Sequence, residues 1–240
     1  MNILITGGVS GLGKAISEKL AIAYPDKIIY ATFCSSEEAA QKMETAFKNI
    51  KTIKCDFTSA SEVLNLAKLL GEWNLGYLVN NAITGMDQNY FHKTDPEYFL
   101  NSFKSNILPT IQITQACLSI FRKQKFGKIV NILSSAIVNT PPIGMSEYAA
   151  SKAYLRSLSN SWAVENIKFN VSSNSVSPAM MRTTLTSYRD ERLFEEMIAQ
   201  HPLKKLVTLE EVAESVLFLC NASQHVNGVN LLMNAGESIQ

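Results

Sequence analysis

The chain has 240 residues, of which 46% are hydrophobic and 18% charged, and its formal net charge is +1. This length and apolar content predict one large α/β domain with a sizeable core, and the balanced charge does not indicate a nucleic-acid partner. No basic segment precedes a long apolar stretch, and no apolar run approaches the ~20 residues that span a bilayer, so we expect a cytoplasmic protein without membrane contact.

Strand-like and helix-like segments alternate along the chain. Short apolar runs predict strands at 2–6, 27–33, 52–55, 77–80, 128–134, 169–176 and 229–233. Helical patterns and start signals predict helices at about 12–24, 35–49, 58–70, 96–125 with an interruption at Pro109, 146–166 and 209–220. Because such alternation builds βαβ units with right-handed crossovers, we predict a doubly wound α/β fold. It has a seven-stranded parallel sheet, helices on both faces and a single domain over residues 1–240.

The segment TGGVSGLG (6–13) joins the first predicted strand to the first predicted helix. Glycines there let backbone amides approach a pyrophosphate, which a helix N-terminus then stabilises. A glycine-rich loop without a ligand is the alternative, and the position between strand and helix argues against it. CDFT (55–58) and NNA (80–82) end the third and fourth strands, at the edge where open α/β sheets bind ligands. These segments predict a Rossmann-type dinucleotide site.

The segment SEYAASKAY (146–154) carries a tyrosine and a lysine four residues apart. This spacing puts Tyr148 and Lys152 on one face of a helix, with small residues between them. A free phenol has a pKa of about 10, and a nearby ammonium favours the phenolate and lowers that pKa. The pair is therefore a candidate general acid–base, although a surface tyrosine–lysine pair is the alternative when the motif stands alone.

In this order, TGGVSGLG, CDFT, NNA, Asn106, Ser135 and Tyr148-x-x-x-Lys152 resemble the motifs of the short-chain dehydrogenase/reductase family, especially its 3-oxoacyl-carrier-protein reductases. The resemblance covers nearly the whole chain and extends to Pro178 and to 201–221. It implies an NAD(P)-dependent oxidoreductase that transfers a hydride between a nicotinamide cofactor and a small-molecule carbonyl or alcohol. Reduction of a ketone or 3-oxoacyl group is the expected reaction.

The resemblance implies four catalytic residues. Tyr148 would protonate the carbonyl oxygen, and Lys152 would lower the phenol pKa and hold the nicotinamide ribose. Ser135 would polarise the carbonyl, with Ser134 as a competing candidate on sequence alone. Asn106 would anchor a water in a proton relay to the lysine. Pro109 lacks an N–H, so we expect either a kinked helix with freed carbonyls beside Asn106 or the start of a new helical segment.

The resemblance also implies a set of cofactor contacts: Gly7, Ser10, Gly11, Leu12, Gly13, Ser35, Asp56, Phe57, Asn80, Ala82, Tyr148, Lys152, Pro178, Met181 and Thr183. Cofactor choice depends on the end of the second strand. There Thr32 replaces the acid that NAD enzymes use for the ribose 2′-hydroxyl. Phosphate-binding arginines are missing as well, but the hydroxyls of Ser35 and Ser36 could donate to a 2′-phosphate. We therefore prefer NADP over NAD.

Residues 179–200 are predicted to form a lid over the substrate, and four methionines (Met86, Met145, Met180 and Met181) suggest an adaptable apolar pocket. Scattered cysteines without CxxC or CxxH spacing predict no metal site. The resemblance implies a homotetramer or homodimer.

Two other functions are compatible with the sequence. Ile83 and Ala179 stand where the family usually has glycine, which raises the possibility of a catalytically silent, dinucleotide-binding regulatory protein. Dehydration or epimerisation of a nucleotide sugar is a third reading. It ranks last because the chain ends soon after the seventh predicted strand, whereas those relatives usually have a longer C-terminal domain.

Overall fold

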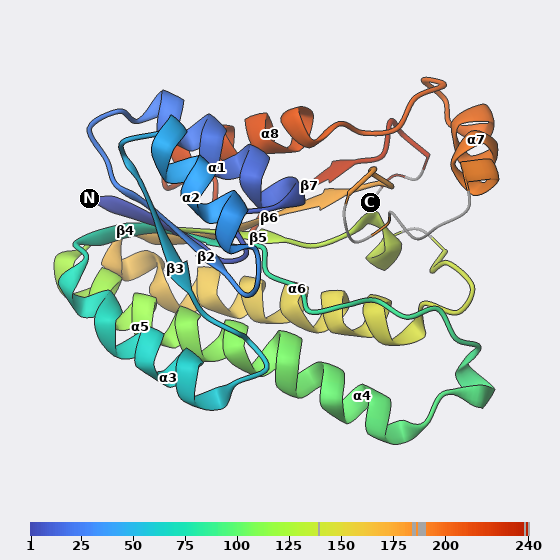
Figure 1. Cartoon of the computed structure of the whole chain (residues 1–240), viewed down its shortest axis with the longest axis horizontal. Helices are drawn as coiled ribbons and strands as arrows, with labels where there is room; N and C mark the ends of the chain where they lie inside the picture. The colour runs from blue at the N-terminus through green and yellow to red at the C-terminus, as the bar shows by residue number, and fades with distance from the viewer. Residues whose placement is uncertain (139, 184–185, 187–190, 238, 240) are drawn as a thin grey trace.

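The computed structural model describes residues 1–138, 140–183, 186, 191–237 and 239. Their backbone forms a parallel seven-stranded sheet with the order β3-β2-β1-β4-β5-β6-β7, which confirms the predicted fold class (Figure 1). The strands are β1 (Asn2–Ile5), β2 (Ile29–Phe33), β3 (Ile50–Lys54), β4 (Leu75–Asn80), β5 (Gly127–Ile132), β6 (Val171–Pro178) and β7 (Asn230–Met233).

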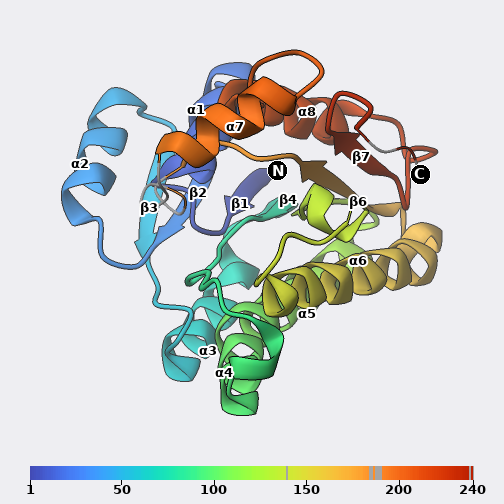
Figure 2. The same ribbon diagram turned by 90° about the vertical axis from the view of Figure 1, so that its right-hand side faces the viewer.

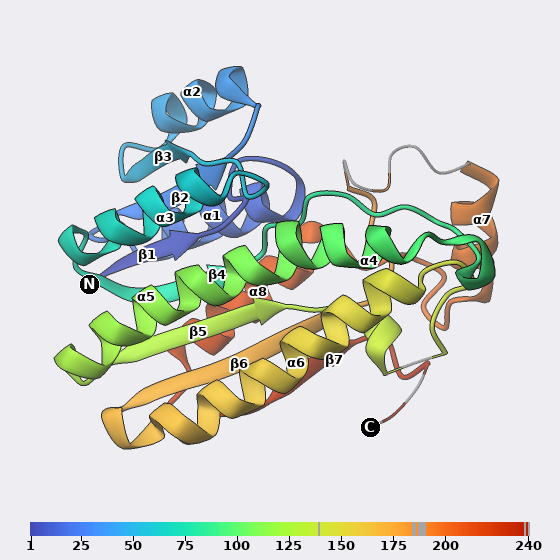
Figure 3. The same ribbon diagram turned by 90° about the horizontal axis from the view of Figure 1, so that it is seen from below.

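Helices cover both faces of the sheet (Figures 1 and 3). On one face lie α1 (Gly11–Ala23), α2 (Glu37–Ala46) and α8 (Leu209–Asn221). On the other lie α3 (Ala60–Leu69), α4 (Pro96–Ser102), α5 (Leu108–Gln124) and α6 (Ser146–Asn166). The short helix α7 (Glu191–Gln200) lies beyond the ends of the strands (Figure 1), and in the view along the strands it lies in front of α1 and α8 (Figure 2).

The central strands are apolar on both faces because each face is covered. Ile3 and Ile5 of β1 pack into the core under α1 and α8, whereas Leu4 between them packs into the core against α3 and α5. The alternation follows from the two-residue repeat of a strand. It explains why β1 reads as a continuous apolar run in the sequence.

The strand order reverses beside β1. The chain runs from β1 to β2 and β3 on one side, and then crosses to place β4 on the other side of β1. The loops after β1 and β4 therefore diverge, and they open a crevice at the carboxyl ends of the strands, where open α/β sheets bind ligands. The glycine turn and the NNA segment both lie at this point.

The predicted helical region 96–125 is divided into three parts. After α4 comes a π-helical turn, η3 (Phe103–Ile107), in which the Leu108 amide bonds to the Phe103 carbonyl. Pro109 then occupies the first turn of α5, where its missing N–H costs little. The carbonyl of Asn106 accepts a hydrogen bond from the Thr110 hydroxyl at 2.8 Å. Pro109 thus starts a new helical segment, and the irregular backbone lies on its N-terminal side.

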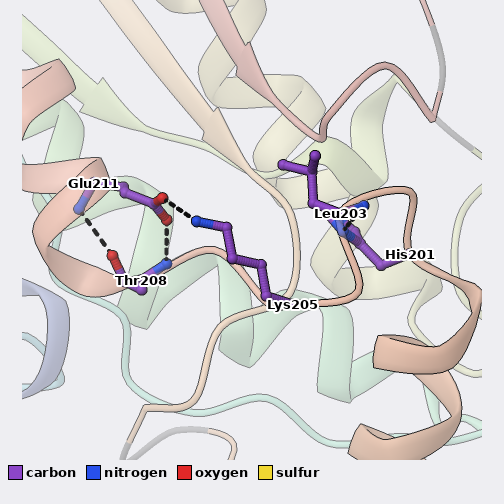
Figure 4. Close-up of polar contacts among 5 residues, drawn as sticks. All are labelled: His201, Leu203, Lys205, Thr208 and Glu211. Carbon is purple, nitrogen blue, oxygen red and sulfur yellow. Dashed lines mark hydrogen bonds and ion pairs between the residues drawn. The ribbon is translucent and has the colours of Figure 1, made fainter.

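The starts of α3 and α8 carry serine and threonine caps and acidic residues in the first turn, in agreement with the start signals in the sequence. Thr208 caps α8 in a capping box: its hydroxyl accepts from the Glu211 amide at 3.1 Å, and the Glu211 carboxylate accepts from the Thr208 amide at 2.8 Å (Figure 4). Such boxes satisfy two amides at a helix start. No helix in the described part of the chain is long and apolar enough to cross a bilayer.

Some strand boundaries differ from the predictions by a few residues. The sixth strand was expected over 169–176 but spans Val171–Pro178. The residues before it form a short 3-10 turn that ends at Asn170 with φ of 59°, a left-handed conformation that a strand cannot contain. The strand therefore begins two residues later than expected. It also ends two residues later, at Pro178, which lines the ligand crevice.

Candidate active site

One large cavity, of about 1040 Å³, lies in the crevice at the carboxyl ends of the strands. Its volume is in the upper range for small-molecule and cofactor sites. All predicted site residues except Asn80 and Asn106 line it. The fold thus gathers the glycine turn, the end of β3, the serine turn after β5, the start of α6 and the end of β6 around one space.

The glycine turn is held tightly from both sides. Gly7 and Gly11 have φ of 63° and 49°, in the left-handed region, and a Cβ on Gly13 would overlap the carbonyl oxygen of Gly7. The Gly7 amide donates to the Thr32 hydroxyl at 2.9 Å. The Asn81 side-chain amide donates to the Gly7 carbonyl at 3.1 Å. These positions require glycine, and their neighbours fix the path of the turn.

The N-terminus of α1 faces the cavity without a capping side chain. Ser10 is the N-cap residue but makes no side-chain capping bond, and the first turn contains no acidic residue. Ser10, Gly11, Leu12 and Gly13 all line the cavity. The free amides of this turn carry the positive end of the helix dipole, so they fit a pyrophosphate group.

The two asparagines after β4 have different positions. Asn80, which was predicted to contact the cofactor, is 6% exposed and absent from the cavity wall. Its side-chain amide donates to the Thr114 hydroxyl at 3.0 Å and to the Asn131 side chain at 2.9 Å, which joins the sheet to α5. Asn81 is the asparagine that lines the cavity. Consecutive residues of an extended chain point to opposite faces, and only one of them can reach the ligand side.

The far end of the cavity is formed by the loops after β2 and β3. The Asp56 carboxylate accepts hydrogen bonds from the Thr58 amide and hydroxyl, each at 2.8 Å, and these bonds lower the pKa of Asp56. Burial raises the pKa of the neighbouring Cys34 thiol, and the Asp56 charge adds to the effect. Ser35 and Ser36 complete this end of the wall.

Tyr148 and Lys152 lie at the start of α6, against the end of β5. Lys152 is 7% exposed, and its ammonium donates to the Ile132 carbonyl at 2.8 Å. The ammonium nitrogen is 5.9 Å from the centre of the Tyr148 ring. Burial lowers the pKa of Lys152 to about 8, against the opposing influence of the Glu147 charge. The pair is therefore a titratable unit inside the cavity and not a surface motif.

The two candidate serines differ in their surroundings. The Ser134 hydroxyl oxygen accepts from the Ala136 amide at 3.2 Å and caps a short 3-10 turn, η4 (Ser135–Ile137). The Ser135 hydroxyl has no hydrogen bond within the described part of the chain, and Ser135 lines the cavity close behind β5. This arrangement favours Ser135 as the serine available to a substrate.

Asn106 borders a second, much smaller cavity of about 20 Å³, which it shares with Tyr148, Lys152, Glu147 and Ser102. Its side-chain oxygen accepts from the Thr84 amide at 2.8 Å and the Thr84 hydroxyl at 3.0 Å. This space is large enough for one water, and its walls offer several polar partners. The relay role of Asn106 stays a prediction, and the geometry puts it beside the lysine as that role requires.

Sequence reasoning missed Glu147, although it directly precedes Tyr148. It is 9% exposed, and its carboxylate accepts from the hydroxyls of Ser102 and Ser151, each at 2.5 Å. An acidic residue in the first turn of a helix is ordinarily a solvated partner of the helix dipole. No signal in the sequence distinguishes that situation from burial under α4.

The other end of the cavity is apolar. Leu193 and Met197 of α7 and Leu206 face it together with the methionines at 86, 145, 180 and 181. His201, also missed from the sequence, is 5% exposed and borders the same wall. Its Nδ1 accepts from the Leu203 amide at 3.2 Å (Figure 4). Because a backbone N–H only donates, Nε2 carries the ring proton, and it has no hydrogen-bond partner in the described residues.

Comparison with known proteins shows the family to which the chain belongs. A family model described as short chain dehydrogenase matches residues 1–193. The chain belongs to the short-chain dehydrogenase family. It is 32% identical to 3-oxoacyl-[acyl-carrier-protein] reductase FabG of Aquifex aeolicus, over 97% of this chain and 95% of the relative. It is 33% identical to carbonyl reductase family member 4 of Xenopus laevis, again over 97% of this chain and 95% of the relative.

Solved structures agree. One described as a short chain dehydrogenase/reductase family protein superposes with a TM-score of 0.84 at 30% identity, over 98% of this chain and 96% of the other. Members of the short-chain dehydrogenase family use nicotinamide cofactors and act on small molecules, and this protein is an oxidoreductase. The enzyme prediction is confirmed at that level.

This short-chain dehydrogenase tolerates its two departures from family glycines. Ala179 follows β6, and its φ is not in the left-handed region, so its side chain causes no backbone strain. Ile83 lines both cavities. Neither residue removes one of the candidate catalytic groups.

Proposed function

We propose that the protein is an NADP-dependent reductase of a ketone or 3-oxoacyl group. The observation that carries this proposal is that Ser135, Tyr148 and Lys152 line the same cavity as the glycine turn before α1. A hydroxyl, a phenol and an ammonium in this order suit the protonation of a carbonyl oxygen. The predicted roles of these residues are part of the proposal.

In the proposed reaction the glycine turn would hold a nicotinamide cofactor, which would supply the hydride for the carbonyl carbon. Ser135 donates a hydrogen bond to the carbonyl oxygen and polarises it. Tyr148 then gives its proton to that oxygen as negative charge develops there. The Lys152 ammonium stabilises the phenolate that remains, and its bond to Ile132 holds it in position.

NADP is the cofactor we favour. Thr32 stands where a carboxylate would bind a ribose 2′-hydroxyl, but it is 1% exposed and its hydroxyl holds the Gly7 amide. Position 32 therefore carries no negative charge that could repel a 2′-phosphate. Ser35 and Ser36, whose hydroxyls could donate to that phosphate, line the same cavity. Lys14 is not a candidate partner because it pairs with Glu18 at 2.7 Å and does not line the cavity.

The substrate end supports an apolar, uncharged substrate near the reacting carbon. Among the described lining residues, Lys152 is the sole lysine or arginine, and methionine and leucine side chains form much of the remaining wall. An acyl chain or an aliphatic ketone matches such a surface. The relative from Aquifex aeolicus is named for a 3-oxoacyl substrate, which supports the same class for this chain. The predicted lid over 179–200, of which residues 184–185 and 187–190 lie outside the described residues, and the predicted homotetramer or homodimer belong to this proposal.

The first test is a titration of the purified protein with NADPH and NADH, followed by nicotinamide fluorescence. Tighter binding of NADPH is expected, followed by its oxidation when acetoacetyl-CoA or a simple β-keto ester is added. Preference for NADH would overturn the cofactor assignment. Binding without turnover of any ketone or oxoacyl ester would support the silent regulatory alternative, for which the protein would need no working Tyr148.

A further inference from the structure

A buried carboxylate lies next to the candidate acid–base pair, and nothing in the proposed reaction uses it. Glu147 is 9% exposed, although it is in the first turn of α6. Two hydroxyls, from Ser102 of α4 and Ser151 of α6, donate to the same carboxylate oxygen. The Asn106 side-chain amide donates in turn to the Ser102 oxygen at 3.1 Å. The carboxylate is thus fixed by a network and not merely covered.

The small cavity of about 20 Å³ connects this network to the reactive groups. Its charged residues, among those the structure describes, are Glu147 and Lys152, and Tyr148 is the remaining titratable group. The remaining residues around it are uncharged: Ala82, Ile83 and Gly85 after β4, Ser102 of α4, Asn106 and Ile107 of η3, and Ser151 and Leu155 of α6. Glu147 and Lys152 therefore line one small cavity, and the Glu147 charge acts on the Lys152 ammonium.

Charge balance gives this arrangement a consequence. A buried ammonium or carboxylate without a counter-charge is unstable in its ionised form, whereas an opposed pair offsets part of the desolvation cost. The Glu147 charge acts on the pKa of Lys152 in the direction opposite to burial. A nearby carboxylate also disfavours a phenolate, because like charges repel.

We propose that Glu147 is the buried counter-charge of Lys152 and keeps the Tyr148–Lys152 pair protonated at neutral pH, which biases the site toward reduction. Reduction needs the neutral phenol as proton donor, whereas oxidation of an alcohol needs the phenolate as acceptor. Glu147 is a positioning residue, because it acts on the reacting atoms only through Tyr148 and Lys152. The directional part of this inference rests on the proposed function, and the protonation part does not.

The decisive variant is Glu147→Gln. Glutamine keeps the shape and one oxygen acceptor for Ser102 and Ser151 but removes the charge. Glu147→Asp keeps the charge and is the conservative rescue. Glu165→Gln makes the same charge change at an exposed position of the same helix and is the matched control.

The first measurement needs no turnover. Tyrosinate absorbance is titrated for each protein and for the same protein carrying Tyr148→Phe, and the difference isolates the Tyr148 phenol. Glu147→Gln is expected to move its midpoint down by about one pH unit, near the lower end of the range for a neighbouring charge. Glu147→Asp and Glu165→Gln are expected to keep the midpoint of the unaltered protein. An unchanged midpoint in Glu147→Gln would overturn the proposal.

The second measurement tests direction. The ratio of kcat for alcohol oxidation to kcat for ketone reduction, each at saturating substrate and cofactor and at pH 7, is expected to rise about tenfold in Glu147→Gln, which corresponds to one pH unit in the phenolate fraction. If the unaltered protein turned over no substrate, the proposed function would fail while the absorbance titration still decided the role of Glu147. A midpoint shift with an unchanged ratio would reject the directional part alone.

A stability cycle covers the case in which the glutamine variant folds poorly. Thermal unfolding is compared for the unaltered protein, Glu147→Gln, Lys152→Met and the double variant. A counter-charge predicts that loss of Glu147 lowers the melting temperature more when Lys152 is present than when methionine replaces it. Equal losses in both backgrounds would contradict an interaction between the two charges.

Discussion

The ammonium of Lys152 donates a hydrogen bond to the carbonyl oxygen of Ile132 at 2.8 Å, and this bond ties the start of α6 to the end of β5. Ser134 and Ser135 follow Ile132 almost at once, so the same contact sets the lysine relative to the serine turn. It also holds Lys152 in the wall of the large cavity, where the residue is only 7% exposed. The position of the lysine, and through it that of the tyrosine one turn earlier, is therefore fixed by a strand and not by the helix alone.

Tyr148→Phe is expected to lower the rate of ketone reduction by about 10²- to 10⁴-fold, because it removes the proton donor and little else. NADPH binding, followed by fluorescence, is expected to stay within a few-fold of the unaltered protein. Tyr154→Phe on the same helix, where the tyrosine is 45% exposed, is the control and should leave the rate unchanged. Normal turnover by the Tyr148 variant would end the assignment of an acid role to this phenol.

Activity and stability are expected to depend on pH in opposite ways at Lys152. Burial lowers the pKa of Lys152 to about 8, whereas a lysine in the unfolded chain titrates near about 10.4. As pH rises through about 8 the folded protein loses the ammonium charge, and the reduction rate should fall. Between these two pKa values the unfolded chain binds more protons, so the contribution of Lys152 to the free energy of unfolding should rise with pH.

The measurement is a pair of profiles from pH 6.5 to 10. One follows kcat for reduction, and the other follows the difference in melting temperature between the unaltered protein and Lys152→Met. A falling rate with a rising difference is expected over the upper half of this range. A stability difference that decreased with pH would mean that the ammonium is stabilised, and not destabilised, by its surroundings.

Gly13→Ala is expected to abolish cofactor binding, because its Cβ would overlap the Gly7 carbonyl and force the glycine turn apart. The control is Gly71→Ala, where an added Cβ has no neighbour within 4 Å. Titration with NADPH should show at least a hundredfold weaker binding for the first variant, or none, and no change for the second. Retained binding in Gly13→Ala would place the pyrophosphate elsewhere.

Ser35→Asp introduces a carboxylate at the end of the cavity where we propose the 2′-phosphate. Repulsion should weaken NADPH binding by tenfold or more and leave NADH binding within about threefold. Ser157→Asp adds the same charge to an exposed position on α6 that does not line the cavity, and should change neither affinity. Equal loss of both cofactors in the Ser35 variant would point to a general disturbance of the loop.

Thr208→Ala removes the hydroxyl that caps α8 and is expected to lower the free energy of unfolding by about 1 kcal/mol. Thermal or urea unfolding monitored by circular dichroism measures this loss. Thr45→Ala is the control, since its exposed hydroxyl bonds back to the Gln41 carbonyl inside α2 and caps nothing; its change should stay within about 0.5 kcal/mol. If both variants lost the same amount, the capping box would contribute nothing particular to α8.

Much of the fold could be predicted from the sequence because its signals are local. The apolar runs of the central strands reflect burial on both faces, and at the starts of α3, α4 and α8 the cap side chains accept hydrogen bonds from free amides. Boundaries were less certain. A π-helical turn divides the helical region before Pro109, and the left-handed Asn170 delays the start of the sixth strand. Residue types alone do not specify either backbone conformation.

The candidate site shows the same division. The motifs around Gly7, Ser135 and the Tyr148–Lys152 pair are short contiguous segments that can be recognised without the fold. The sequence by itself therefore determined the family and the candidate catalytic groups. Side-chain direction needed the packed structure. Asn80 and Asn81 are adjacent in sequence, yet one joins the sheet to α5 and the other lines the cavity.

The tertiary structure alone decided what surrounds those groups. Thr32 turns its hydroxyl inward because the Gly7 amide, 25 residues away in sequence, needs an acceptor. Glu147 is buried because Ser102, 45 residues before it, brings α4 over the start of α6. Burial and electrostatic pairing depend on contacts between distant segments, and such contacts exist only after the chain has folded.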